Sequence, residues 1–188
     1  MLVVTDDIES YYNSLGKGEN PDFDRLIVSG DSSAIRSIAV LIDNGHRVEC
    51  ILDSGCQIVA MSEAVCHSLG LAYDPSIVLH MQSANGTLDQ SLGLMRNVPF
   101  QINVITIYLQ VHIISSPAYD VLLGRPFDIL TESIVRNFAN EDQTITIHDP
   151  NTGRQVTIPT IPRSQKEQEC THPHHEANIR HTHQQQGF

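Results

Sequence analysis

The sequence is short of positive charge and of long apolar runs. Its 188 residues include 11 lysines and arginines against 22 aspartates and glutamates, which gives a formal net charge of -11. Proteins that bind the phosphate backbone of nucleic acids normally carry a basic patch, so we expect no nucleic-acid partner. No stretch approaches the roughly 20 apolar residues of a membrane-spanning helix, and we therefore expect no membrane partner either.

The four cysteines fit no metal or redox motif. None of them forms a Cys-x-x-Cys pair, so the sequence offers neither a zinc ribbon nor a thioredoxin-type site. The first residues, Met1 to Asp7, lack the basic start of a secretory signal. Because thiols outside the secretory pathway stay reduced, we expect free cysteines and an intracellular, cytoplasmic protein.

Composition divides the chain into three stretches. Residues 1–31 form an N-terminal extension, in which apolar residues recur at helical spacing from Ile8 to Leu15 and a polar linker follows. Residues 32–162 have the length and apolar content of one domain. Residues 163–188 are rich in glutamine and histidine and poor in aliphatic side chains, so they are predicted to be a disordered tail.

The central stretch has the pattern of short strands separated by turns. Asn44-Gly45 lies between two apolar runs and is a strong hairpin signal, and residues 149–153 mark a second hairpin. Strands are predicted over residues 37–42, 47–52, 58–61, 76–82, 88–98, 100–107, 108–114, 120–123, 144–148 and 155–158, and helices over 62–69 and 127–132. This spacing predicts an all-β barrel or sandwich with one or two short helices.

Three short segments stand out from this pattern of strands and turns. Asp53-Ser54-Gly55 directly follows an apolar strand, where a buried, unpaired carboxylate would be costly. A tight turn whose backbone N–H groups hold the carboxylate would remove that cost, and an isolated Asp-Ser-Gly would mean no more than such a turn. Residues 81–88 form a polar hairpin tip suited to a mobile flap. Residues 121–125 place a glycine between an apolar strand and a helix.

In this order, the three features resemble the retropepsin family of aspartic proteases. Cys56 to Ser62, Gln82 to Gly86 and Leu123 to Asp128 are similar to the protease segments of fungal Ty3/gypsy-type retrotransposon polyproteins. The resemblance covers roughly residues 35–162. It implies a retropepsin-like acid-protease barrel that is active as a homodimer, cleaves a peptide or polyprotein substrate, and needs no metal or cofactor.

The resemblance also implies a role for each motif. Asp53, Ser54 and Gly55 would form the catalytic turn, with Asp53 as the catalytic carboxylate. The flap would comprise Ser83, Ala84, Asn85, Gly86 and Thr87, and the turn would be supported from behind by Leu122, Leu123, Gly124 and Arg125. Many retroviral members continue the motif with Ala-Asp, whose Asp pairs with the later Arg. This chain has Cys56-Gln57 instead, so Arg125 lacks that ionic partner.

The number of motifs predicts how many chains make one site. An aspartic dyad needs two carboxylates about 3 Å apart that share one proton, whereas this chain has a single Asp-Ser-Gly. Two copies related by a twofold axis would each supply Asp53. The dyad would then activate a water molecule that attacks the peptide carbonyl.

Other kinds of site fit less well. A serine-hydrolase elbow needs Gly-x-Ser-x-Gly, which is absent. Cys66 and His67 are sequence neighbours and would not face each other on a helix. The histidines of the tail lack the spacing of a zinc knuckle. The remaining alternative is an inactive or domesticated retropepsin-like domain that serves as a dimerisation or scaffold module.

Overall fold

The computed structural model describes residues 7–18, 29–30, 32–43, 45–82 and 86–163. The chain divides into two compact units, Met1–Ala34 and Ile35–Phe188. The first unit contains the helix α1 (Asp7–Ser14), where helical spacing of apolar residues predicted it. The domain boundaries expected after residues 31 and 162 stay predictions, and the tail beyond residue 163 lies outside the described residues.

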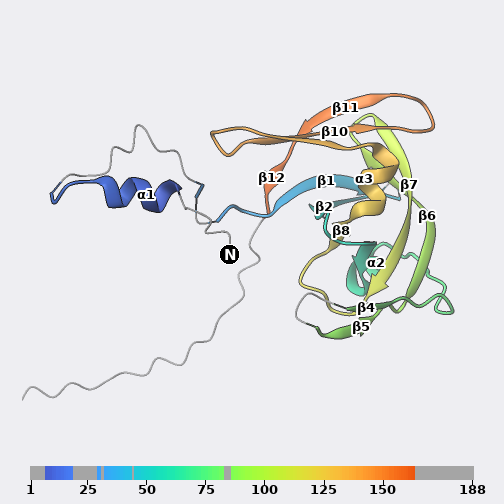
Figure 1. The fold of residues 1–188 in the computed structure, drawn as a ribbon. Coiled ribbons are helices and arrows are strands. Elements are labelled where there is room, and N and C mark those ends of the chain that lie inside the picture. The colour runs from blue at the N-terminus through green and yellow to red at the C-terminus, as the bar shows by residue number, and fades with distance from the viewer. Residues whose placement is uncertain (1–6, 19–28, 31, 44, 83–85, 164–188) are drawn as a thin grey trace, which may run out of the picture. The chain divides into compact units, whose positions relative to one another are not determined.

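A closed β-barrel forms the body of the second unit (Figure 1). The order around it is β1 (Arg36–Ile42), β2 (His46–Leu52), β8 (Val121–Leu123), β3 (Val59–Ser62), β7 (Ile105–Ile114) and β6 (Gly93–Ile102). An additional β1–β6 pairing closes the barrel, and β12 (Ile161–Pro162) is paired with the start of β1. Thus β8, which comes late in the sequence, lies between β2 and β3.

Alternation of apolar side chains explains why these segments form a barrel. Along β7 the odd-numbered residues from Ile105 to Ile113 are buried, whereas Tyr108 and Gln110 are exposed. The buried side chains meet in one apolar core that also contains Phe100 and Phe127. Removing this apolar surface from water is the main favourable contribution to folding.

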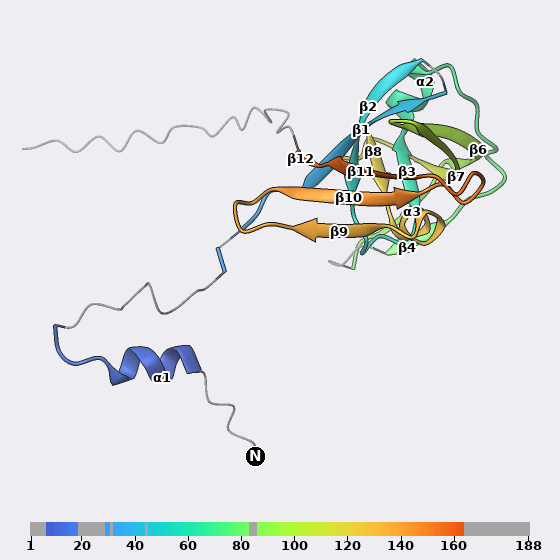
Figure 2. The same ribbon diagram turned by 90° about the horizontal axis from the view of Figure 1, so that it is seen from above.

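Smaller elements surround the barrel. The helix α2 (Glu63–Ser68) begins after Ser62, whose hydroxyl caps it by accepting the Val65 amide at 3.2 Å. A second helix, α3 (Arg125–Thr131), follows β8. Figure 2 shows β9, β10 and β11 side by side as a separate sheet. These strands span Ile134–Asn137, Gln143–His148 and Gln155–Pro159, and a two-stranded sheet is formed by β4 (His80–Gln82) and β5 (Leu88–Gln90).

The predicted strands between residues 76 and 114 need correction. The strand expected over 100–107 is wrong, because the chain turns back at Asn103 and Val104 between β6 and β7, and Asn103 adopts a φ of 53°. The strand expected over 88–98 is split between β5 and β6, and β4 is shorter than residues 76–82. The all-β class, both hairpins and both short helices of this unit are confirmed.

Candidate active site

Asp53 lies immediately beyond β2, where β2 runs parallel to β8. Leu52 is paired with Leu123, and the Asp53 amide donates to the Leu123 carbonyl oxygen at 3.0 Å. The Gly55 amide donates to Asp53 Oδ1 at 3.0 Å, and the Cys56 amide donates to the Asp53 carbonyl oxygen at 3.0 Å. Residues 53–58, which we call the Asp53 turn, therefore present an exposed carboxylate whose orientation is set by the backbone.

Gly124 fits against the back of the Asp53 turn. A Cβ atom on this glycine would lie 2.6 Å from the Cys56 carbonyl oxygen and still closer to that of Ile58. The Arg125 amide donates to the Cys56 carbonyl oxygen at 2.7 Å. Real Cβ atoms do not approach oxygen so closely, so the backbone of β8 can support the turn only where a side chain is absent.

The other predicted supporting residues lie around Gly124. Leu122 and Leu123 are buried in β8, on opposite sides of the strand and in different apolar clusters. The side chain of Arg125 is exposed, and among the described residues no hydrogen bond or ion pair engages its guanidinium group. This geometry agrees with the missing acidic residue after Gly55, and Arg125 acts on the turn through its backbone alone.

The predicted flap is an antiparallel hairpin. His80 is paired with Gln90 and Gln82 with Leu88, so β4 and β5 form its two arms. At its tip, the predicted residues Ser83, Ala84 and Asn85 lie outside the described residues. Gly86 has a φ of +85°, and Thr87 is exposed. We refer to the described residues of this hairpin and its root, 79–82 and 86–91, as the flap.

A pocket of about 440 Å³ separates the flap from the Asp53 turn. It is lined by residues 55–58 of the turn and residues 79–82 of the first flap arm. Beneath it lies a second apolar cluster made of Ile58, Ala60, Ile114 and Leu122. Leu79, Met81 and Tyr119 pack against this cluster. Of the predicted site residues, Gly55 lines this pocket and Leu122 belongs to the cluster beneath it. Asp53 and Ser54 precede the lining residues of the turn, and Gly86, Thr87 and residues 123–125 are not part of the lining.

Tyr119 packs against the cluster beneath the pocket, although no sequence motif selects it. Burial raises the pKa of its phenol to about 12, and negative charge at Cys56, Asp89 and Asp53 adds to the shift. The phenol therefore stays protonated at the edge of the apolar cluster beneath the pocket. Tyr119 stands in a Pro-Ala-Tyr loop with no motif or periodicity, so only the fold reveals its position.

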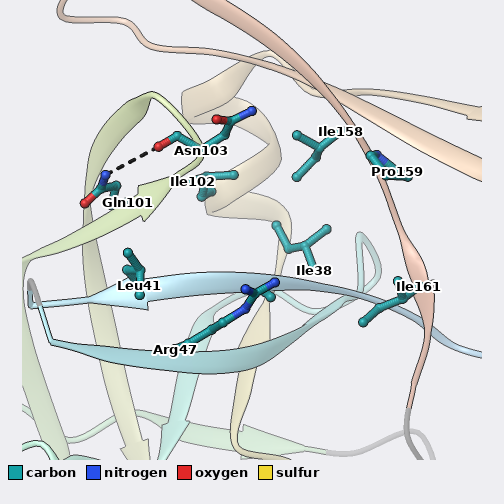
Figure 3. Close-up of a pocket in the computed structure, with 10 residues that line it drawn as sticks. Ile38, Leu41, Arg47, Gln101, Ile102, Asn103, Ile158, Pro159 and Ile161 are labelled. Carbon is teal, nitrogen blue, oxygen red and sulfur yellow. Dashed lines mark hydrogen bonds between the residues drawn. The ribbon is translucent and has the colours of Figure 1, made fainter.

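A second hollow of about 440 Å³ lies elsewhere on the barrel (Figure 3). Ile38, Ile102 and Ile158 surround it, and Leu41, Arg47 and Ile161 lie at its margin. The Gln101 side chain donates to the Asn103 carbonyl oxygen at 3.4 Å beside it. None of the predicted site residues lines this hollow, so it is separate from the Asp53 pocket.

Within the described ranges, no group of three or more His, Cys, Asp or Glu side chains could hold a metal ion. The helices described here are all too short or too polar to cross a membrane. The histidines of the tail lie beyond the last described residue.

Comparison with known proteins agrees with this geometry. Residues 38–127 match a family model described as "gag-polyprotein putative aspartyl protease". The matched segment contains the Asp53 turn, the flap and β8. No match was found among curated proteins.

The fold is also found in a solved structure. The retroviral protease-like domain of Ddi1 from Leishmania major superimposes with a TM-score of 0.54 at 19% sequence identity, over 70% of this chain and 97% of that one. The barrel therefore has the retropepsin-like fold, and residues 38–127 are similar in sequence to retroviral-type aspartyl proteases.

Proposed function

We propose that this protein is an aspartic endopeptidase in which Asp53 from two chains forms the catalytic dyad. The observation that carries the proposal is the position of Asp53. Its carboxylate is exposed and accepts the Gly55 amide, and its turn lines one side of a pocket whose other side is lined by the first arm of a hairpin. An extended peptide between turn and flap would present its carbonyl group to that carboxylate.

The chemistry follows from two carboxylates at close range. Like charges about 3 Å apart cannot both ionise readily, so the pair shares one proton. The ionised member takes a proton from water, which attacks the peptide carbonyl, and the protonated member donates to the developing oxyanion. The two titrations belong to the dyad rather than to either chain. No metal or organic cofactor has a role in these steps.

A homodimer is needed because one chain supplies one Asp-Ser-Gly. The edge of β9 is a suitable surface for the second copy. β9 is the outer strand of its sheet, and all four of its residues are exposed, including Ile134 at 60% and Val135 at 42%. An unpaired strand edge readily pairs with another chain, and antiparallel pairing of two β9 strands would be isologous, as a twofold axis requires.

We further propose that the substrate is a polyprotein of the retrotransposon type. The family description names gag-polyproteins. The three segments that are similar to fungal Ty3/gypsy-type proteases, residues 56–62, 82–86 and 123–128, support the same source. The apolar cluster beneath the pocket would receive apolar side chains next to the cleaved bond. The free thiols of Cys50, Cys56 and Cys66 support a cytoplasmic location.

Purified protein incubated with a peptide library at mildly acidic pH tests the proposal. We expect cleavage that pepstatin inhibits, that EDTA leaves unchanged and that Asp53→Asn removes. A dimer that cleaves no peptide would instead indicate the scaffold module. Cleavage that is lost in EDTA and restored by zinc would contradict the metal-free mechanism.

A further inference from the structure

The two arms of the flap meet at a buried serine. The Ser91 amide donates to the Leu79 carbonyl oxygen at 2.9 Å. In the opposite direction, the Leu79 amide donates to the Ser91 side-chain Oγ, also at 2.9 Å, rather than to a backbone carbonyl. Ser91 is only 1% exposed. One buried hydroxyl thus satisfies the backbone of the opposite arm at the root of the hairpin.

The same hydroxyl connects the flap to the barrel. The Nδ1 atom of His112, on β7, lies 3.3 Å from Ser91 Oγ. Because Ser91 Oγ already accepts the Leu79 amide, its hydroxyl proton is available for donation to Nδ1. The residues that follow Ser91 and His112 in the sequence are also bonded, because the Leu92 amide donates to the Ile113 carbonyl oxygen at 2.7 Å. Burial lowers the pKa of His112, which favours the neutral ring that can accept this proton.

His112 also lies over the floor of the candidate site. It is paired in register with Ala60 of β3, a member of the apolar cluster beneath the pocket. Leu79 packs against that same cluster. The root of the flap and the floor of the pocket are therefore joined through one short chain of contacts.

We propose that Ser91 and His112 form a clamp that holds the flap over the Asp53 turn, so that both are positioning residues for the peptidase reaction. The proposal deepens the function proposed above and depends on it only for its kinetic part. A two-stranded hairpin is marginally stable on its own, and all three residues of β5 are exposed. The position of the flap therefore depends on the contacts of its root and on the packing of Leu79 and Met81 against the apolar cluster.

Amide hydrogen exchange tests the clamp without requiring activity. Ser91→Ala leaves the Leu79 amide without its acceptor, and the loss of one such bond corresponds to roughly a 5- to 30-fold change in a local opening equilibrium. We expect faster exchange at Leu79 and along the arms, with the β6–β7 amides little changed. Ser37→Ala is the matched control, because Ser37 is also buried and its hydroxyl donates to Glu49 Oε1 at 2.8 Å, away from the flap.

Steady-state kinetics then separate positioning from general support. If the clamp only shifts the flap between open and closed positions, Ser91→Ala should raise KM several-fold and leave kcat nearly unchanged, because the apparent affinity falls with the closed fraction. A merely structural role would lower the active fraction and kcat at constant KM. His112→Asn keeps a polar atom near the Nδ1 position and should retain more of the wild-type KM than His112→Ala.

Each outcome decides the proposal. Unchanged exchange at Leu79 in Ser91→Ala, or acceleration spread equally over the barrel, would overturn the clamp. If Ser91→Ala fails to fold, His112→Ala is measured in its place, and a normal flap in that variant has the same meaning. Faster flap exchange in a protein that cleaves nothing would support the clamp and reject the peptidase.

Discussion

The Asp53 turn and the flap face each other across one pocket, yet they are held by different kinds of contact. The turn is fixed by backbone groups, namely the Leu123 carbonyl, the Gly55 and Arg125 amides and the bare Cα of Gly124. The flap is a two-stranded sheet outside the barrel, joined at its root through the Ser91 hydroxyl. The turn is therefore held mainly by main-chain contacts, whereas the root of the flap depends in addition on one side-chain hydroxyl.

The difference matches the two tasks of an aspartic peptidase. The carboxylate must remain in position to within a fraction of an ångström for proton transfer. The flap must admit a peptide and then close over it. Under the proposed function, the turn would supply the fixed reacting group and the flap would supply the cover.

The largest expected effect on activity comes from replacing the side chain of Asp53 in the turn. Asp53→Asn should lower kcat/KM by roughly 10²- to 10⁴-fold or more, because an amide cannot take a proton from water. Its Oδ1 can still accept the Gly55 amide, so the melting temperature should change little. Asp43→Asn, in the β1–β2 turn, is the matched loss of charge and should keep full activity. Equal turnover by Asp53→Asn and wild type would falsify the assignment.

The next largest effect should come from a side chain that clashes with the backbone of the Asp53 turn. Gly124→Ala places a Cβ against the carbonyl oxygens of Cys56 and Ile58, and overpacking of this kind costs about 1–3 kcal/mol. We expect a lower free energy of unfolding together with reduced kcat. Gly45→Ala is the control, since its Cβ would meet only Asp43 O at 3.8 Å. Equal stability of the two variants would mean that β8 does not support the turn.

In the flap, a comparable strain should affect function more than stability. Gly86 has a φ of +85°, and a Cβ there would meet nothing within 4 Å, so Gly86→Val adds only backbone strain of roughly 1–2 kcal/mol. Gly153, with a φ of +70° in the β10–β11 turn, is its matched control. Gly86→Val should lose kcat/KM with little change in melting temperature, and Gly153→Val should do the reverse. The same kinetic loss in both variants would contradict a specific role for the flap.

The smallest effect concerns pH at the flap root. Burial lowers the pKa of His112 from its ordinary value of 6.5, so the unfolded chain takes up this proton more readily than the folded one. The free energy of unfolding should therefore fall as the pH drops below about 6.5. Denaturant unfolding at pH 7 and pH 5 should show a shallower decline for His112→Asn than for wild type. Parallel declines would show that His112 does not titrate in this way.

The sequence predicted best those features that depend on neighbouring residues. Asn44-Gly45 and residues 149–153 marked hairpins, Ser62 marked the start of α2, and Asp-Ser-Gly marked a turn that holds a carboxylate. Each of these is decided by local backbone geometry and side-chain hydrogen bonds. The all-β class followed from the number of such signals.

The features that were missed depend on residues far apart in the chain. β9 and β12 have no strong local pattern and exist because β10 and β1 pair with them. Asn103 is a single polar residue between Ile102 and Val104 with no glycine beside it, so no strong turn signal marked this turn. Tyr119 and Ser91 belong to the site only because β8, β7 and the flap meet there, which tertiary pairing alone decides.

Mixing wild-type and Asp53→Asn chains tests the shared site most directly. Random pairing of equal amounts leaves about a quarter of the dimers with two wild-type chains, so activity per wild-type chain should fall to about half. Subunit exchange is to be confirmed independently with differently tagged chains. Charged substitution of Val135 on the proposed β9 contact should weaken the dimer and make the activity of wild-type Asp53 sites more sensitive to dilution. Undiminished activity per wild-type chain after full exchange would show that one chain carries a complete site and would contradict the account.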